Sequence, residues 1–329
     1  MTTIAEAPTA SPANRTPLAG WTAETVRLLL CGGAPNARAK HIITSLSFDD
    51  YFKANDEELR ERGLSRYELG SDELSEDVTA LLLGTPEYPA ALSLLRTAPV
   101  LLFVRGNLAA LTVGVGIVGT RAISALGRAT VPAAVAAAVR LKVPVHSGLA
   151  LGVDALAHQL ALDAGLLTCA VLATHPTNPS PSANVALATS ILEHGGALVS
   201  EQRSDVTTPA GPNLMARNRV IAGLSSVVVP AEAGLPSGTL YTVAAALEND
   251  RPLVVPVPKN AARKWPGARG LLALTGNAPL TAKDLHVTKD CWAEVERRGW
   301  VANAAPESPE ALTEMICLAH WFSPVTQKA

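Results

Sequence analysis

Residues 113–158 read Val-Gly-Val-Gly-Ile-Val-Gly-Thr-Arg, then an alanine-rich run, then Val-Pro-Val-His-Ser-Gly-Leu-Ala-Leu-Gly-Val-Asp-Ala-Leu-Ala-His. At both ends of this stretch a short apolar run leads into a turn that contains glycine, and a helical pattern follows the turn. The first helix is expected at about 125–141, with Ser124 as its cap, and the second begins at about 153. Two successive strand–helix units of this kind predict a parallel sheet that binds ligands above the carboxyl ends of its strands.

The same stretch contains a literal G-x-G-x-x-G at Gly114, Gly116 and Gly119. A dinucleotide fingerprint places its glycines after the strand and needs an acidic residue about twenty positions later for the ribose. Here Gly114 and Gly116 fall inside the expected strand, and no Asp or Glu occurs between Gly114 and Asp154. The two glycines are interpreted as positions of close backbone packing within the sheet. We therefore expect no nicotinamide cofactor, and no other cofactor is predicted.

Strand and helix patterns continue on both sides of this stretch and predict about six strand–helix repeats. Expected strands lie near 100–104, 168–173, 197–200, 226–230 and 253–256, and expected helices near 184–194, 213–224 and 239–249. Because crossovers between parallel strands are right-handed, such a series favours a doubly wound, mostly parallel sheet. We assign residues 85–282 to this extended Rossmann-like α/β domain.

Three further segments complete the expected domain organisation. Residues 1–18 are mainly Thr, Ala, Pro and Ser with little to bury, so a disordered tail is expected. Short helical patterns predict a small helical domain over 19–84, whose acidic composition favours protein contact or scaffolding over DNA binding. Amphipathic patterns around 291–301 and 309–322 predict a short helical appendage at the C-terminal end, over residues 283–329.

The composition is that of a globular, alanine-rich protein, with 48% hydrophobic and 17% charged residues. Four cysteines are far apart and form no C-x-x-C pair, which argues against a zinc ribbon or a disulfide framework and indicates a reducing compartment. No apolar run reaches the roughly 18 residues of a membrane span, and the N-terminal residues lack a signal-peptide pattern. We expect a cytoplasmic protein with no membrane partner.

Charge is unevenly distributed, although the formal net charge is only −2. Eleven acids and four bases lie between Asp49 and Asp77, whereas six bases and no acids lie between Arg251 and Lys283. Such asymmetry is typical of a near-neutral protein with one basic face, which could meet a polyanion. A solvated face of no special purpose is the alternative for the basic stretch.

Four polar turns are expected at the carboxyl ends of strands or at the starts of helices, along one edge of the sheet. Their residues are Gly119, Thr120 and Arg121; Ser147 and Gly148; Arg217, Asn218 and Arg219; and Ser237, Gly238 and Thr239. Glycine in such a turn exposes backbone N–H groups, and helix amino ends add partial positive charge. Arginine contributes forked donors that fit phosphate oxygens. Four such turns in one chain predict a phosphate-bearing ligand.

Two of these arginines also have an ordinary structural interpretation. Arg217 and Arg219 are two positions apart and cannot both face one direction on a regular helix, so one of them could pair with Glu201 or Glu232. The two glutamates could in turn form a general acid/base pair. Because neither a nucleophile nor a set of metal ligands accompanies them, ion pairing is the favoured interpretation, and no catalytic residue is predicted.

Asp154 and His158 are four positions apart on one expected helix, a spacing that could hold a metal ion. The favoured alternative gives each residue a structural role. An acid in the first turn suits the helix dipole, and the imidazole hydrogen-bonds inside the protein. We therefore predict no metal site.

Several motifs together resemble the DprA/Smf family of DNA-processing proteins, bacterial factors that bind single-stranded DNA and load the recombinase RecA onto it. They follow the order of the family over roughly residues 85–282. The motifs are Tyr88-Pro89, Pro99-Val-Leu-Leu-Phe-Val-Arg-Gly-Asn107, Ile117-Val-Gly-Thr-Arg121, Ser147-Gly-Leu-Ala-Leu-Gly-Val-Asp-Ala-Leu-Ala-His158, Ser200-Glu201, Arg217-Asn-Arg-Val-Ile-Ala-Gly-Leu-Ser225 and Ser237-Gly-Thr239.

The resemblance implies an extended Rossmann domain, a homodimer and a DNA pocket built from the four turns. It implies a non-catalytic protein that protects incoming or processed single-stranded DNA and loads RecA in a transformation-type recombination pathway. The arginines and the exposed amides would hold successive phosphates of one strand. Since only 4% of residues are aromatic, contact with the backbone is expected to dominate over base stacking.

The chain departs from the family pattern at several positions and is therefore identified as a divergent member. The family usually has serine at Thr120 and an aromatic residue before the Arg-Asn-Arg triplet, where this chain has Leu214-Met-Ala216. The loop 175–181 lacks the usual glycine and Tyr-Pro, and Pro256-Val-Pro-Lys259 replaces a usual Pro-Gly. No convincing counterpart of the C-terminal winged helix of some members is found.

Two other functions use the same type of fold. The LOG-like phosphoribohydrolases carry a catalytic glutamate after a Gly-Thr motif, but the aligned position here is Thr242, so nucleotide hydrolysis by that route is disfavoured. A sensor of a small nucleotide-derived ligand could use the same turns. Binding of a mononucleotide without binding of an oligonucleotide would identify the sensor.

Overall fold

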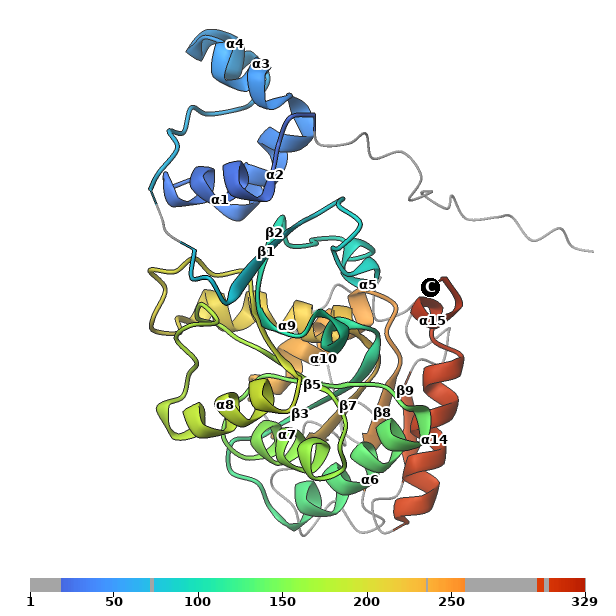
Figure 1. Ribbon diagram of the computed structural model, residues 1–329. Coiled ribbons are helices and arrows are strands. Elements are labelled where there is room, and N and C mark those ends of the chain that lie inside the picture. Colours follow the sequence, from blue (N-terminus) through green and yellow to red (C-terminus); the bar gives the residue numbers. More distant parts are fainter. Residues whose placement is uncertain (1–18, 72–73, 235, 258–300, 305–307, 329) are drawn as a thin grey trace, which may run out of the picture.

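The computed structural model describes residues 19–71, 74–234, 236–257, 301–304 and 308–328. Its strands are β1 (Val78–Leu82), β2 (Leu101–Gly106), β3 (Gly114–Gly119), β4 (Val145–Ser147), β5 (Thr168–Val171), β6 (Ala197–Ser200), β7 (Ser225–Glu232), β8 (Leu253–Pro256) and β9 (Val301–Ala304). They form one nine-stranded sheet in the order β1-β2-β6-β5-β4-β3-β7-β8-β9 (Figure 1).

The sheet is doubly wound about β3. From β3 the chain builds β4, β5 and β6 outward on one side, then returns to build β7, β8 and β9 on the other, and all seven strands are parallel. Among the described strands only β2 runs in the opposite direction, antiparallel to β1 on one side and to β6 on the other. The predicted α/β, mostly parallel Rossmann-like fold is confirmed. The strand order reverses between β3 and β7, which is where ligands of such sheets bind.

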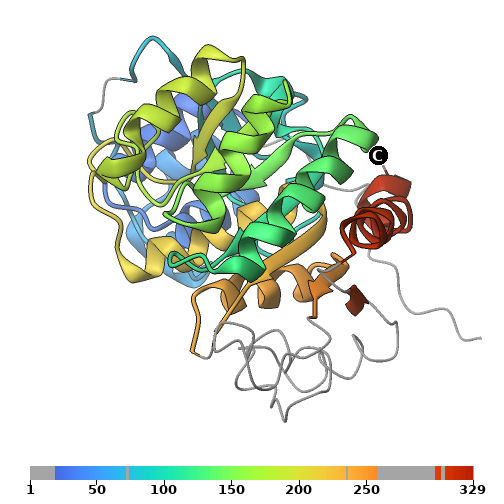
Figure 2. The same cartoon turned by 90° about the horizontal axis from the view of Figure 1, so that it is seen from below.

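Helices cover both faces of the sheet, because successive strand residues point to opposite faces and both faces are apolar. One face carries α6 (Ala125–Leu141), α7 (Val153–Asp163), α8 (Val185–Glu193) and α14 (Pro309–Trp321). The other carries α5 (Ala90–Ser93), α9 (Gly211–Leu224) and α10 (Thr239–Glu248), as the view from below makes clear (Figure 2). In β3, Ile117 packs with the α6 layer and Val118 with the α9 layer.

The glycines of β3 allow close packing, as the sequence predicted. A Cβ atom at Gly114 would lie 2.1 Å from the Pro144 carbonyl oxygen. At Gly116 it would lie 2.5 Å from the Ser225 hydroxyl. Both strands beside β3 therefore approach it more closely than any side chain would permit.

The N-terminal helices are α1 (Ala23–Cys31), α2 (Asn36–Ser45), α3 (Phe48–Lys53) and α4 (Asp56–Glu61), within the stretch where the sequence predicted short helices. The sequence predicted only helices up to residue 84 and missed β1. Val78 and Leu82 of β1 share a core with the helices and with Phe103 of β2, so the helical region packs against this edge of the sheet.

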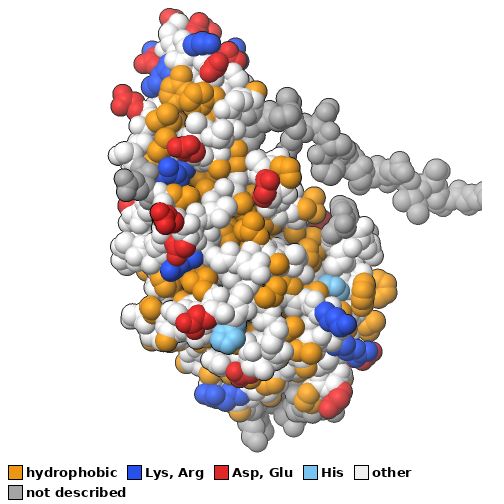
Figure 3. All heavy atoms as spheres, viewed as in Figure 1, with side chains coloured by type: hydrophobic (Ala, Val, Ile, Leu, Met, Phe, Trp, Pro, Cys, Tyr) orange, Lys and Arg blue, Asp and Glu red, His pale blue; other side chains and the backbone are white. Residues whose placement is uncertain are grey.

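The acidic stretch of the helical region does not form a purely acidic surface. Acidic and basic side chains are interspersed over α3 and α4 (Figure 3). Lys53 lies 3.6 Å from Asp49, and Arg66 lies 3.4 Å from Asp56.

The expectation of a separate helical appendage at the C-terminal end is wrong for its described residues. The strand β9 extends the sheet beside β8, and α14 packs against α6 through Leu312 and Ile316 in a shared core. The predicted helix near 309–322 is confirmed, but it belongs to the main domain. The predicted tail (1–18) and most of the segment around 291–301 lie outside the described residues. Within the described part of the chain, no helix is long and apolar enough to cross a membrane.

Candidate nucleic-acid interface

The turn after β3 presents Arg121 to solvent. The Thr120 amide donates to the Glu232 carbonyl at 2.9 Å, which ties this turn to the end of β7. Arg121 is exposed and makes no hydrogen bond or ion pair with the other described residues. Arg121 is therefore a cation at the switch point of the sheet whose guanidinium N–H groups remain available to an anion. The predicted anion contact requires such an available group.

The Ser147–Gly148 turn, in contrast, is enclosed. Ser147 is fully buried, and its hydroxyl donates to the Ile117 carbonyl at 2.6 Å. Gly148 is also buried, and two residues later the Ala150 amide donates to the Asp154 carboxylate at 3.4 Å. An internal carboxylate thus lies beside the turn where the sequence predicted a phosphate.

Arg217 lies under this turn rather than in the open. It is 8% exposed, donates from Nη1 to the Val171 carbonyl at 3.1 Å, and lies 4.0 Å from Asp154. Burial lowers the pKa of Arg217; the Asp154 charge opposes this shift, and the nearby Arg121 charge adds to it. The two charges therefore influence each other, but only Arg121 is accessible to solvent. The neighbouring Asn218 is also buried.

Arg219 takes the ion-pair alternative. Its Nη1 and Nη2 each donate to Glu201 at 2.6 Å, and its Nε donates to the Thr97 carbonyl at 2.8 Å. Glu201 is 4% exposed, so the pair is largely withdrawn from solvent. The structure does not bring Arg219 together with Arg121 and Arg217. This agrees with the expectation that Arg217 and Arg219, two positions apart on one helix, do not face the same direction.

Glu232 is likewise engaged, at the start of α6. Its Oε2 accepts the Ser124 amide at 2.9 Å, and the residue is 3% exposed. The amino end of α6 is thus neutralised by the protein itself. Glu201 thus makes the ion pair that the sequence favoured, whereas Glu232 accepts a backbone amide and makes no ion pair with the described residues.

The Ser237–Gly238–Thr239 turn opens α10, on the opposite face of the sheet from α6 and α7. Gly238 is exposed with open space around its Cα, whereas Thr239 is buried and donates its amide to the Ser237 hydroxyl at 3.2 Å. Of the four predicted turns, this one and the Arg121 turn therefore present polar groups to solvent.

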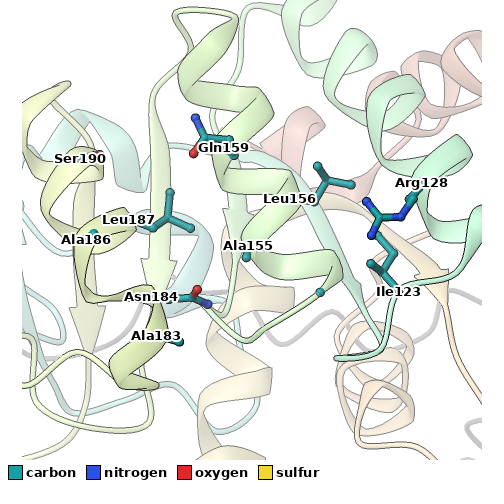
Figure 4. Close-up of a pocket in the computed structure, with 11 residues that line it drawn as sticks. Ile123, Arg128, Ala155, Leu156, Gln159, Ala183, Asn184, Ala186, Leu187 and Ser190 are labelled. Atoms are coloured by element: carbon teal, nitrogen blue, oxygen red, sulfur yellow. The ribbon is translucent and has the colours of Figure 1, made fainter.

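An open groove that the sequence did not indicate lies beside the Arg121 turn. It has a volume of about 580 Å³ and runs over α7 between α8 and the start of α6 (Figure 4). Arg128 of α6 and Gln159 of α7 border it, and the exposed side chain of Arg128 makes no hydrogen bond or ion pair with the described residues. The available signal was a basic residue early in the helix that follows a Gly-Thr-Arg turn.

The predicted basic stretch contributes nothing to this edge in the described chain. Arg251 is 3% exposed and donates to the Ala91 and Gly223 carbonyls at 3.2 and 3.3 Å. Burial lowers the pKa of Arg251 to about 10. The other five bases, Lys259, Arg263, Lys264, Arg269 and Lys283, lie outside the described residues.

His158 has the internal hydrogen bond that the sequence favoured over metal binding. Its Nδ1 lies 2.7 Å from the Thr168 hydroxyl, which itself donates to the Val145 carbonyl at 2.8 Å. Since that hydroxyl proton is committed, Nδ1 of His158 must be the donor. Within the described part of the chain, no three His, Cys, Asp or Glu side chains are grouped as metal ligands.

Two buried histidines make the fold sensitive to acid. Burial lowers the pKa of His158 to about 3 and that of His146 to about 4. The unfolded chain binds protons below pH of about 6.5 and the folded protein does not, so stability is full above that value and falls below it. From pH of about 7.5 to about 5.5 the two rings together are expected to remove about 3 kcal/mol.

Urea unfolding at these two pH values measures the loss. His158→Gln is expected to remove about half of the pH-dependent loss. An unchanged pH dependence in this variant would show that His158 titrates normally in the folded protein.

Comparison with known proteins gives one consistent match. The family model described as DNA recombination-mediator protein A matches residues 79–290. Protein Smf of Escherichia coli K12 is 40% identical over 171 residues, which are 52% of this chain and 43% of that protein. DNA processing protein DprA of Streptococcus pneumoniae is 39% identical over 166 residues, which are 50% of this chain and 57% of that protein. The chain thus spans about half the length of these relatives.

Solved structures match over a larger part of the chain. The X-ray structure of DNA processing protein A from Streptococcus pneumoniae has a TM-score of 0.62 and 26% identity, over 81% of this chain and 97% of that one. DNA processing protein A from Helicobacter pylori, solved for its single-stranded DNA binding mode, has a TM-score of 0.53 and 22% identity. This second match covers 73% of this chain and 94% of that one, and indicates a shared fold.

Proposed function

The chain belongs to the DNA recombination-mediator protein A family, and from this premise we propose that it binds single-stranded DNA along the carboxyl edge of its sheet. The observation that carries the proposal is a pair of exposed arginines beside an open groove, Arg121 and Arg128, whose side chains have no hydrogen-bond or ion-pair partner in the described part of the chain. Both can neutralise phosphates without breaking any interaction that holds the described fold together. The single-stranded DNA binding mode of the Helicobacter pylori protein supports this ligand class.

The lining of the groove suits a single strand better than a duplex. Ala155, Leu156 and Leu187 supply apolar surface, and Gln159 and Asn184 supply side-chain amides. The Asn184 Nδ2 donates to the Leu149 carbonyl at 2.8 Å, which leaves its carbonyl oxygen for a ligand. Bases of a single strand expose apolar faces and polar edges together, whereas a duplex hides the faces by stacking.

The residues proposed to contact DNA are only partly those expected from the sequence. Gly119, Thr120 and Arg121 remain, together with the solvent-facing Ser237–Gly238 turn. The other predicted residues are buried or ion-paired and can support the site only from inside the protein; they are Ser147, Gly148, Arg217, Asn218 and Arg219. Arg128 joins the set.

The finer expectations remain part of the proposal. The protein acts without catalysis, protects the strand, and loads the recombinase RecA onto it as a cytoplasmic homodimer. Both candidate acids are engaged in internal contacts, and Thr242, in place of a hydrolase glutamate, is 2% exposed. These contacts argue against the nucleotide hydrolase.

The proposed loading activity is tested by RecA filament formation on single-stranded DNA that carries a blocking single-strand-binding protein. The chain is expected to shorten the lag before filaments form. An unchanged lag, with strand binding intact, would exclude RecA loading but not DNA binding. Calorimetry with a mononucleotide tests the sensor alternative, and tight binding of the mononucleotide without an oligonucleotide complex would contradict the proposal.

A further inference from the structure

The loop between β4 and α7 is organised around one buried carboxylate. Asp154 is 5% exposed, accepts a hydrogen bond from the Ala150 amide at 3.4 Å and lies 4.0 Å from Arg217. It therefore uses an N–H group that the loop would otherwise offer to a ligand. Burial raises the pKa of Asp154, against the opposing effect of the nearby Arg217 charge and of the neighbouring polar groups of the loop.

The far end of the same loop supports the Arg121 turn. Gly152 has a φ of +79°, and a Cβ atom there would lie 2.4 Å from the Thr120 carbonyl oxygen and 2.5 Å from that of Arg121. The next amide, of Val153, donates to the Thr120 carbonyl at 3.1 Å. The backbone of the loop and the backbone of the Arg121 turn are thus in direct contact, with no side chain between them.

We propose that Asp154 is a positioning residue for DNA binding: its carboxylate fixes loop 148–152, and this loop holds the backbone from which Arg121 reaches the phosphate. The inference rests on the proposed function, since it concerns the same site. Asp154 itself touches no ligand. It acts through the contact between Gly152 and the Arg121 turn.

Arg217 has a supporting role as the internal counter-ion. Its guanidinium lies against Gly148, where a Cβ atom would come within 1.3 Å of Nη1, so the loop and the guanidinium fit only because residue 148 is glycine. Nη1 already donates to the Val171 carbonyl, and the buried Nε has no hydrogen-bond partner among the described residues. Arg217 balances the Asp154 charge and leaves phosphate binding to Arg121.

A set of variants separates positioning from charge balance. Asp154→Leu removes the acceptor and leaves Arg217 as a buried, uncompensated cation, so this variant is expected to unfold more easily. Asp154→Leu combined with Arg217→Met removes both charges and recovers much of that stability. We expect the double variant still to lose single-strand affinity about as far as Arg121→Ala does, with the same flattening of the salt dependence. Arg217→Met alone is expected to keep the salt dependence of the wild type.

Two outcomes with these variants would overturn the inference. A double variant with wild-type affinity and salt dependence would make Asp154 a counter-ion only. A flattened salt dependence in Arg217→Met would make Arg217 itself a phosphate ligand. Gly152→Ala provides a second route, because it disturbs the contact with the turn while leaving the Asp154–Arg217 pair in place. It should reproduce the binding defect, and wild-type binding would also overturn the inference.

Hydrogen exchange keeps this test separate from the proposed function. The Thr120 amide donates to the Glu232 carbonyl, and the Ala122 amide to the Thr120 hydroxyl at 3.2 Å. Both amides are expected to exchange faster in the double variant than in Arg217→Met, whether or not DNA binds. Equal exchange would contradict the positioning role, whereas a wild-type protein that binds no single-stranded DNA would contradict the function alone.

Discussion

Arg121→Ala is expected to weaken single-stranded DNA binding about ten- to a hundredfold, the cost of one charged hydrogen-bonded contact. The slope of log affinity against log salt should flatten by about 0.7, the contribution of one neutralised phosphate on a single strand. Because Arg121 is exposed and has no ion pair or hydrogen bond in the described fold, stability should not change. Fluorescence anisotropy with a labelled oligonucleotide at several salt concentrations measures both quantities.

A matched control exists on α6 itself. Arg128→Ala is expected to weaken binding in the same way as Arg121→Ala but less, because Arg128 lies farther from the switch point. Arg140, twelve positions later and about 18 Å along the helix, is exposed and pairs with Glu314 at 2.9 Å. Arg140→Ala should bind like the wild type. If Arg121→Ala and Arg140→Ala behaved alike, the contact would depend on overall charge and not on the Arg121 turn.

Arg219→Met is expected to lower the free energy of unfolding by about 3–5 kcal/mol. It leaves Glu201, which is 4% exposed, as a buried carboxylate without its two guanidinium bonds. The contact between α9 and the Thr97 carbonyl is lost as well. Urea unfolding at neutral pH measures the change.

The double variant Glu201→Gln with Arg219→Met shows whether the loss comes from the unpaired charge. Because neither partner is charged, it should recover much of the lost stability. Full wild-type stability in Arg219→Met alone would mean that the pair is solvated and contributes little. That result would also return Arg219 to the set of candidate phosphate contacts.

The central part of the fold could be predicted because its signals are local. The apolar run that ends at Gly119 and the run before Gly148 each predict a strand, and the alanine-rich pattern between them predicts α6. The strands β1 and β9 were missed for a physical reason. Each is a short segment at an edge of the sheet, and its pairing partner, not its own pattern, makes it a strand.

The site could be predicted only in part, because contacts between residues far apart in the sequence decide which of its polar side chains are exposed. Glycine and arginine at the strand ends correctly marked the Arg121 turn as an exposed polar site. The same signal was misleading at Arg217, whose carboxylate partner Asp154 precedes it by more than sixty positions. For Arg219 the glutamate partner was named as an alternative, but only the structure decides between an ion pair and a free cation. Arg128 was missed because the groove beside it exists only once three helices pack together.

The most direct test of the account is a titration of the wild-type protein with a single-stranded oligonucleotide and with a duplex of the same length, at about 50 and about 200 mM salt. We predict tighter binding of the single strand at both concentrations, with an affinity that falls steeply between them. Equal affinity for the two DNAs, or an affinity for the single strand that does not respond to salt, would contradict a strand held by its phosphates at the Arg121 turn.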